Sequence, residues 1–111
     1  MTIEEIICGY LHNKLDVVAL PEKPNRPYDG KVFVQRTSGS GQHIRETTVA
    51  IQSYGESMYK AATLNDQVIA TMYGIIELDS IIEISLNSNY EYSDTDSKEY
   101  RYQAVFDITH Y

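Results

Sequence analysis

Three histidines are the residues of this chain best suited to bind a transition metal, but their spacing does not favour a site. His12, His43 and His110 fall on different expected elements, without the paired His, Cys or carboxylate spacing that zinc sites show. We therefore interpret each as a surface or capping histidine and predict no metal ligand.

An acidic run near the C-terminus has the spacing of the first ligands in a calcium loop. Asp94 and Asp96 alternate and Glu99 follows, but the third oxygen ligand, the central glycine and the late glutamate of an EF-hand are absent. We interpret the run as the polar tip of a hairpin, with a weak contact to a divalent ion as the alternative.

Two residues have side chains that could act as a nucleophile. Cys8 is the only cysteine and lies among apolar residues of an expected helix, which favours a buried hydrophobic role and excludes an internal disulfide. Ser40 lies between glycines, but neither a Gly-x-Ser-x-Gly elbow nor the Gly-Lys-Ser/Thr of a phosphate-binding loop surrounds it. We predict no catalytic residue, no cofactor and no enzymatic activity, since an enzyme would need acids or histidines converging in a cleft.

Length and composition favour one domain spanning residues 1–111. Two separate cores would each be marginal in 111 residues, of which 42% are hydrophobic. No apolar run approaches the ~20 residues of a membrane span, and Glu4 and Glu5 stand where a signal peptide carries positive charge. The net charge of -7, with nine scattered basic residues, disfavours specific nucleic-acid binding. We expect a soluble protein made in a cytoplasm, with neither membrane nor sequence-specific nucleic acid as a partner.

The N-terminal part predicts a helix followed by a stiff connector. Thr2 and Glu5 have the spacing of a capping box, and apolar residues then recur at helical spacing until about Asn13. Residues 17–20 are expected to form a short strand or an extended segment that leads into the connector. Three prolines between residues 21 and 27 favour an extended connector on the surface.

The middle of the chain predicts two strands joined by a glycine loop. Asp29-Gly30 is a turn signal, and the first strand runs from Lys31 to Arg36. We expect the segment from Ser38 to Gly41 to be a flexible loop, and the β-branched residues from Thr47 to Tyr54 to form the second strand.

The main helix is expected next. Glu56 and Ser57 supply break and cap residues, and Gly74 is expected to close the helix. Its apolar face recurs every three or four positions, at Met58, Ala61, Ala62, Val68, Ile69, Met72 and Tyr73.

Two alternating stretches predict an antiparallel hairpin at the end of the chain. Ile82, Ile84, Leu86, Tyr90 and Tyr92 share one parity and are expected on one half-buried face. A polar turn over residues 93–97 follows, and alternation resumes over residues 100–108. The whole pattern predicts an α+β fold, with a single mixed, mostly antiparallel sheet of four to five strands packed against two helices.

The chain contains ten tyrosines and no tryptophan, and six of the tyrosines lie from residue 73 onward. Tyrosine suits half-buried strands and is also enriched at protein interfaces. Ordinary strand packing and an assembly interface both account for this composition.

Three segments together resemble the tail-terminator, or tail-completion, proteins of long-tailed bacteriophages, whose fold is typified by the lambda tail terminator. A proline-rich run leads into residues 33–39, whose Arg36-Thr37-Ser38-Gly39 is similar to the family's Arg-Thr-Gly-Gly, with Ser38 in place of a glycine. Residues 49–52 and the alanine-bearing helix after them are similar to the family's second strand and long helix. Residues 100–104 resemble its closing strand, in which an aromatic-Gln-Ala segment follows a variable turn.

This resemblance implies a ring of six subunits that caps the tail tube, ends its polymerisation and presents a surface to the head–tail connector. It implies a virion protein of the tail–head junction, made in the bacterial host's cytoplasm, with DNA passing through the lumen. Polar tips can order against partners. The candidate subunit or partner interface is therefore Ser38, Gly39, Ser40, Gly41, Gln42 and His43, together with Asp94, Thr95 and Asp96.

Two alternatives remain open from the sequence. One is a neighbouring head–tail adaptor or neck protein of related shape. The other is a small ligand-binding or peptide-binding α+β domain of bacterial origin, which a deep apolar pocket would favour.

Overall fold

The computed structural model describes residues 1–23, 30–93 and 99–111. The later part of the proline connector, including Asp29, lies outside the described residues, as does the predicted acidic tip of Asp94, Thr95 and Asp96. In chain order the elements are α1 (Ile3–Leu15), β1 (Val18–Leu20), β2 (Lys31–Ser40), β3 (Arg45–Gly55), α2 (Met58–Met72), the 3-10 helix η1 (Tyr73–Glu77), β4 (Ile81–Glu91) and β5 (Tyr100–His110).

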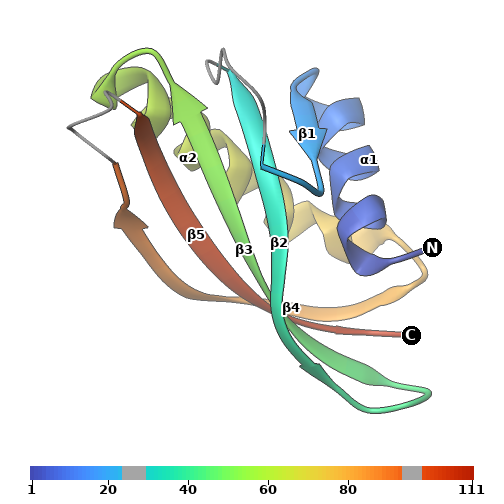
Figure 1. The fold of residues 1–111 in the computed structure, drawn as a ribbon. Helices are drawn as coiled ribbons and strands as arrows, with labels where there is room; N and C mark the ends of the chain where they lie inside the picture. Colours follow the sequence, from blue (N-terminus) through green and yellow to red (C-terminus); the bar gives the residue numbers. More distant parts are fainter. Residues whose placement is uncertain (24–29, 94–98) are drawn as a thin grey trace.

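The strands form one sheet in the order β1-β2-β3-β5-β4 (Figure 1). Among the described strands, β1 and β2 pair in parallel, whereas β2 with β3, β3 with β5 and β5 with β4 are antiparallel. Both α-helices lie behind the same face of the sheet in Figure 1. The predicted fold class is therefore confirmed: α+β, with a single mixed and mostly antiparallel sheet and two α-helices.

Helix α1 begins with the predicted capping box. The Glu5 amide donates to Thr2 Oγ1 over 3.2 Å, and the Thr2 amide donates to Glu5 Oε1 over 3.3 Å. These two bonds satisfy amides that have no partner within the helix. The pKa of the Glu5 carboxyl is lowered because its Oε1 accepts from the Thr2 amide and from the Thr2 hydroxyl. The helix continues to Leu15, slightly beyond the expected end, and Asp16 closes it in the left-handed conformation.

Helix α2 begins as predicted but ends differently. Ser57 is its N-cap and accepts from the Lys60 amide over 3.2 Å. The expectation that Gly74 closes the helix is wrong, because the chain continues from Met72 into η1 with Gly74 inside it. A side chain at Gly74 would place its Cβ 2.8 Å from the Tyr10 hydroxyl, so close packing of α1 on η1 accounts for this glycine.

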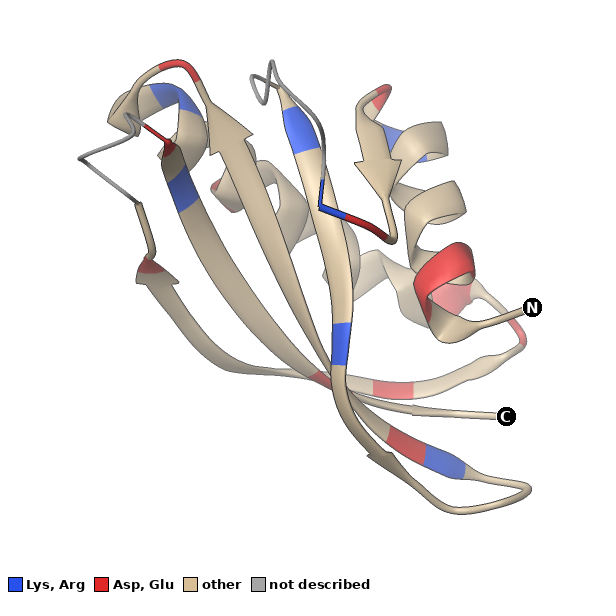
Figure 2. Cartoon of the chain, viewed as in Figure 1, with Lys and Arg blue, Asp and Glu red and all other residues tan. Residues whose placement is uncertain are grey.

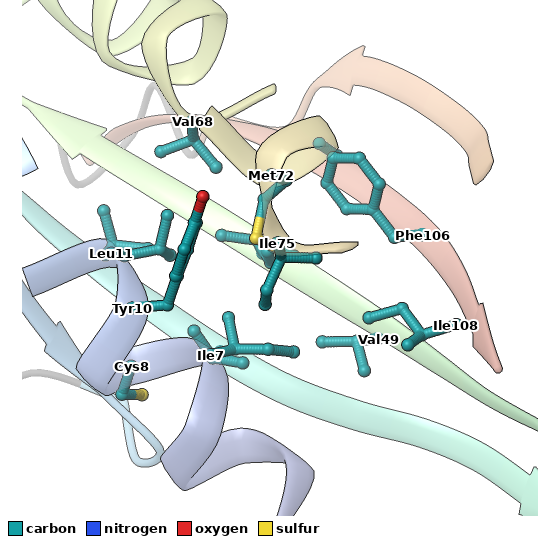
Figure 3. Packing of buried hydrophobic residues seen from close by; sticks show 14 of the residues in the cluster. Ile7, Cys8, Tyr10, Leu11, Val49, Val68, Met72, Ile75, Phe106 and Ile108 are labelled. Atoms are coloured by element: carbon teal, nitrogen blue, oxygen red, sulfur yellow. The ribbon is translucent and has the colours of Figure 1, made fainter. Parts of the chain in front are cut away.

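The core lies between the helix layer and the sheet (Figure 3). Helix α1 contributes Ile7 and Leu11, α2 contributes Val68 and Met72, and η1 contributes Ile75. These side chains pack on a row of sheet residues that includes Val49, Phe106 and Ile108. Leu64 and Asn65 are also buried, although the apolar spacing expected for α2 did not include them.

Strand β4 departs from the predicted alternation at two places. The pairing of β4 with β5 shifts between Ile81 and Glu83 and again between Leu86 and Ser88. Each shift inserts a residue and moves the following side chains to the other face. Ile84 and Leu86 pack on the core as expected, but Ile82 and Tyr90 are exposed, so the prediction of one continuous face is wrong.

Candidate functional site

The segment expected to be a flexible glycine loop is largely strand. Ser38, Gly39 and Ser40 belong to β2 and pair with Thr48, Thr47 and Glu46. The loop prediction is therefore wrong for these residues. The pairing of β2 with β3 shifts between Arg36 and Ser38 and then continues opposite two β-branched residues of β3, Thr47 and Thr48.

The actual turn lies between the two strands, at residues 41–44. Gly41 has a φ of 94°, and a Cβ there would lie 2.2 Å from the carbonyl oxygen of Ile44. Gly41, Gln42 and His43 are therefore the candidate interface residues that form the tip, while the remaining candidates of this segment form the strand leading to it.

Every residue from 35 to 46 is exposed, and we call this segment the distal hairpin. Its exposed side chains include Ile44 at the tip, with 54% of its surface accessible. The proximal part of the same strand is different, since Val32 and Val34 are fully buried. The distal hairpin therefore extends past the surface that the helices of its own chain cover.

The sheet face opposite the helices is polar at the distal end. A groove of about 500 Å³ is bounded there by hydroxyl and carboxylate side chains, among them Ser38, Thr48 and Glu83. Asp107 is held in this groove by a 2.8 Å bond from Thr48 Oγ1 and a 2.9 Å bond from Asn87 Nδ2. In the parts of the chain that the structure describes, no three His, Cys, Asp or Glu side chains gather closely enough to hold a metal ion.

Basic side chains lie at the other face of the distal hairpin, near the start of α1. A second hollow, of about 380 Å³, is lined there by residues that include Arg36, Arg45 and His110. Arg36 is 3.3 Å from a Glu4 carboxylate oxygen, so part of this charge is paired within the chain.

The three histidines occupy separate environments. The ring of His12 is exposed and contacts the carbonyl oxygen of Val17 over 3.0 Å just beyond the end of α1, in line with a capping role, and His43 is exposed at the hairpin tip. His110 is only 4% exposed, with Nε2 2.8 Å from Thr47 Oγ1. The expectation of a surface or capping histidine is wrong for His110, which the sequence could not place because its burial comes from strand pairing.

Cys8 is buried in α1, as expected. Burial, with a smaller contribution from the charges of Glu4 and Glu5, raises the pKa of its thiol to about 11. A thiol with that pKa stays protonated at neutral pH and is a poor nucleophile.

Two tyrosines, one on β4 and one just beyond its end, form an exposed cluster beside β5. The rings of Tyr90 and Tyr92 meet edge to face with centroids 6.0 Å apart, and the Arg101 guanidinium lies 4.5 Å from the Tyr92 centroid. Gln103 donates to the Tyr90 hydroxyl. Other tyrosines are core residues, because Tyr54 is fully buried and Tyr10 nearly so. Core packing and an exposed cluster thus both contribute to the unusual composition.

The sheet has two long edges with no strand beside them in the described residues. Strand β4 is last in the order, and β1 covers only residues 31–33 of β2, which leaves residues 34–40 open on that side. The charged residues of β2 are both basic, Lys31 and Arg36, whereas those of β4 are both acidic, Glu83 and Glu91. Figure 2 shows this difference as blue segments on β2 and red segments on β4.

An apolar strip borders the β4 edge on the helix side. Tyr73 is 49% exposed and meets Phe106 edge to face with centroids 6.4 Å apart, and Ile76 is 52% exposed. The strip is completed by half-buried side chains of α2 and β4. Its members are Ile69, Tyr73, Ile76, Ile84 and Leu86. The sequence did not indicate it, because Tyr73 and Ile69 have ordinary core spacing on the helix.

Comparison with known proteins adds no identification. No protein-family model and no curated protein sequence matches this chain. Among the helices that the structure describes, none combines the length and the hydropathy needed to cross a bilayer.

Proposed function

We propose that this protein is a structural phage or prophage protein that caps the tail tube as a ring, ends tube polymerisation and forms the head–tail joining surface. The proposal begins with the resemblance of three segments to tail terminators. These segments correspond to β2, to β3 with α2, and to β5, which are the centre of the sheet and the helix packed on it.

The observation that carries the proposal is the pair of open sheet edges at opposite sides of one subunit. Unpaired strand edges in a soluble protein are usually short, charged or covered, because they otherwise pair with other chains. Here β4 is 11 residues long and lies open along one side in the described part of the chain. A subunit with two different open edges suits a head-to-tail ring better than an isolated monomer.

The polar groove supports a lumen along which DNA passes without sticking. Its acidic residues are Glu46, Glu83 and Asp107, and its other side chains are largely hydroxyls. Carboxylates repel phosphates, so a ring with this face inward would hold DNA only weakly. In this proposal the partners are other copies of the chain, the tail tube protein and the head–tail connector. The protein has no catalytic role and resides at the tail–head junction of the virion.

A small ligand-binding domain is the competing function from another class. Its best support is an apolar hollow of about 230 Å³ beside Tyr59 and Leu64 on α2. Ligand sites of that class are usually deeper and of about 300–1,000 Å³. The hollow of about 500 Å³ on the other face of the sheet is polar rather than apolar, which favours the assembly role.

The test is to add the purified protein to a polymerising tube protein encoded in the same genome and to measure tube lengths by electron microscopy. Short tubes with a ring at one end are expected, and the mean length should fall as the protein concentration rises. Unchanged tube lengths, with the protein monomeric by light scattering, would remove the proposal and favour an adaptor or ligand-binding role.

A further inference from the structure

The two open edges have the direction that lets one copy of the sheet continue into another. Strands β2 and β3, β3 and β5, and β5 and β4 are each antiparallel, so β2 and β4 of one chain also run in opposite directions. A second copy placed beside β4 with its sheet in the same orientation therefore presents β2 antiparallel to β4. Antiparallel pairing needs no reorientation of either edge.

Charge on the two edges favours contact between unlike edges. The side chains of β4 contribute Glu83 and Glu91 and no base, whereas those of β2 contribute Lys31 and Arg36 and no acid. Contact of β4 with β4 would place like charges together, which is costly at an interface. Contact of β4 with the open part of β2 avoids this repulsion, because Arg36 is the charged residue of that part and is paired with Glu4 of its own chain.

The apolar strip provides the hydrophobic part of the same contact. Helices α1 and α2 both lie on one face of the sheet, and α1 contacts β1 and β2. A second copy whose β2 pairs with β4 would bring its own α1 toward Tyr73 and Ile76, because α1 lies on the strip's side of the sheet. Exposed aromatic and aliphatic side chains beside an open strand edge are typical of the centre of an interface.

We propose that the β4 edge and its apolar strip bind the open part of β2, residues 34–40, of a second copy of this chain. This inference rests on the proposed ring and names the two surfaces that meet in it. The contact is heterologous: one copy uses β4 and the other uses β2. An open oligomer therefore keeps one unused surface of each kind, at its two ends, until the ring closes.

Cysteine cross-linking tests this contact directly. Ser85 on β4 and Ser38 on β2 are exposed, whereas the native Cys8 is buried. The double variant Ser38→Cys with Ser85→Cys should give a ladder of covalent multimers on mild oxidation, both on tube ends and at high concentration in solution. In an equal mixture of the two single variants, cross-linking should stop at the covalent dimer. Each single variant alone should give no covalent multimer.

A control variant places the second cysteine away from the proposed contact. Asp66 is exposed on α2, so Ser38→Cys with Asp66→Cys should give no ladder above the level of either single variant. A covalent dimer from Ser85→Cys alone would show a symmetric β4 contact and would overturn the inference. A ladder from the Asp66 control as strong as that from the Ser85 pair would also overturn it.

A second variant tests the apolar strip without relying on cross-linking. Ile76→Glu changes a side chain that is already half exposed, so the melting temperature should stay close to that of the unmodified protein while self-association weakens at least tenfold. Unchanged self-association with an unchanged melting temperature would remove the strip from the interface.

The same samples distinguish this inference from the proposed function. Shortened tubes without a cysteine ladder would retain the terminator function and overturn the β4–β2 contact. A ladder without any shortening of tubes would retain the contact and overturn the terminator function.

Discussion

The β2–β3 pair has a proximal half, residues 31–34 and 49–55, and a distal half, residues 35–48, and the two halves differ in what stabilises them. On β3, every residue from Val49 to Gly55 is buried, because α2 packs on this strand and β2 and β5 flank it. On β2, every residue from Gln35 to the end of the strand is exposed, although the hydrogen-bonded ladder continues. The comparison shows that backbone pairing alone extends a hairpin, whereas burial depends on what lies across its faces.

The proximal half also contains polar side chains that are joined to one another by hydrogen bonds. The Tyr54 hydroxyl donates to Gln52 Oε1 over 2.8 Å, and Gln52 Nε2 donates to Gln103 Oε1 over 2.8 Å. Such a chain of satisfied buried groups specifies one register of β3 against β5. In the distal half the side-chain bonds of β2 are exposed, for example the 3.2 Å bond from Thr37 Oγ1 to the Thr48 carbonyl. We therefore assign stability to the proximal half, whereas the partner contact proposed above uses the distal half.

The largest expected difference comes from removing one apolar side chain that lies beside the proximal half and one at the tip of the distal half. Phe106→Ala empties a fully buried position beside Val49 and should lower the free energy of unfolding by about 3–5 kcal/mol. Ile44→Ala at the exposed tip should change it by less than about 0.5 kcal/mol. Urea denaturation followed by circular dichroism measures both, and equal losses would contradict the assignment.

Two glycines of the same hairpin provide a second comparison. A Cβ at Gly55 would lie 2.5 Å from the Ala61 amide nitrogen, and backbone atoms of α2 would have to move. Gly55→Ala should therefore cost about 3 kcal/mol. A Cβ at Gly39 would make an ordinary 3.5 Å contact with Thr47 Oγ1, so Gly39→Ala should be neutral or stabilise by up to ~0.5 kcal/mol. Thermal denaturation of the two variants checks the prediction, and a destabilised Gly39→Ala would show that the distal half is also tightly packed.

The buried thiol of Cys8 predicts that the stability of the protein depends on pH. Its pKa is raised to about 11 from an ordinary value of 9.0, so the folded state keeps the thiol neutral at a pH where the unfolded state ionises. This contribution to stability is complete below pH 9 and is lost as the pH rises toward 11, by roughly 2–3 kcal/mol at ~1.4 kcal/mol per pH unit.

Denaturation midpoints measured between pH 8 and pH 11 test this prediction. The difference in stability between the natural protein and Cys8→Ala should shrink by that amount over this range, since the variant lacks the titrating group. In the Cys8→Ala background, a cysteine introduced at the exposed Ser38 should titrate at the ordinary pH of a thiol. An unchanged difference between the natural protein and Cys8→Ala would argue against the raised pKa.

The smallest expected effect concerns two hydroxyl groups, one at the start of α2 and one on the distal hairpin. Ser57→Ala removes the N-cap of α2 and should cost about 1 kcal/mol, while Ser57→Gly should cost only a few tenths. Thr37→Ala removes an exposed bond of the distal hairpin and should cost less than about 0.5 kcal/mol. A larger loss for Thr37→Ala than for Ser57→Ala would reverse the assignment of stability to the proximal half.

Several local features could be predicted because they depend on neighbouring residues alone. The capping box of Thr2 and Glu5, the N-cap at Ser57 and the class of the fold follow from short-range spacing and were confirmed. The strand status of Ser38, Gly39 and Ser40 could not be predicted, because composition favoured a loop and the decisive contacts are with Thr47 and Thr48 on another strand.

The candidate interface shows the same division. Gly41, Gln42 and His43 were correctly placed at a polar tip, since glycine at a positive φ is a local signal. The β4 edge and the apolar strip were missed, because two register shifts on β4 redistribute Ile82, Leu86 and Tyr90 between the faces. No spacing within β4 reports such a shift, which arises from pairing with β5.

By itself, the sequence determined the number and kind of most elements, the start of both α-helices and the acidic balance of the chain. These properties arise from hydrogen bonds and side-chain periodicity within a few residues of one another. Only the tertiary structure decided which strand edges stay open, which tyrosines are exposed and where His110 and Asp107 lie. Those properties depend on contacts between residues far apart in the chain, and it is on them that the proposed assembly surfaces rest.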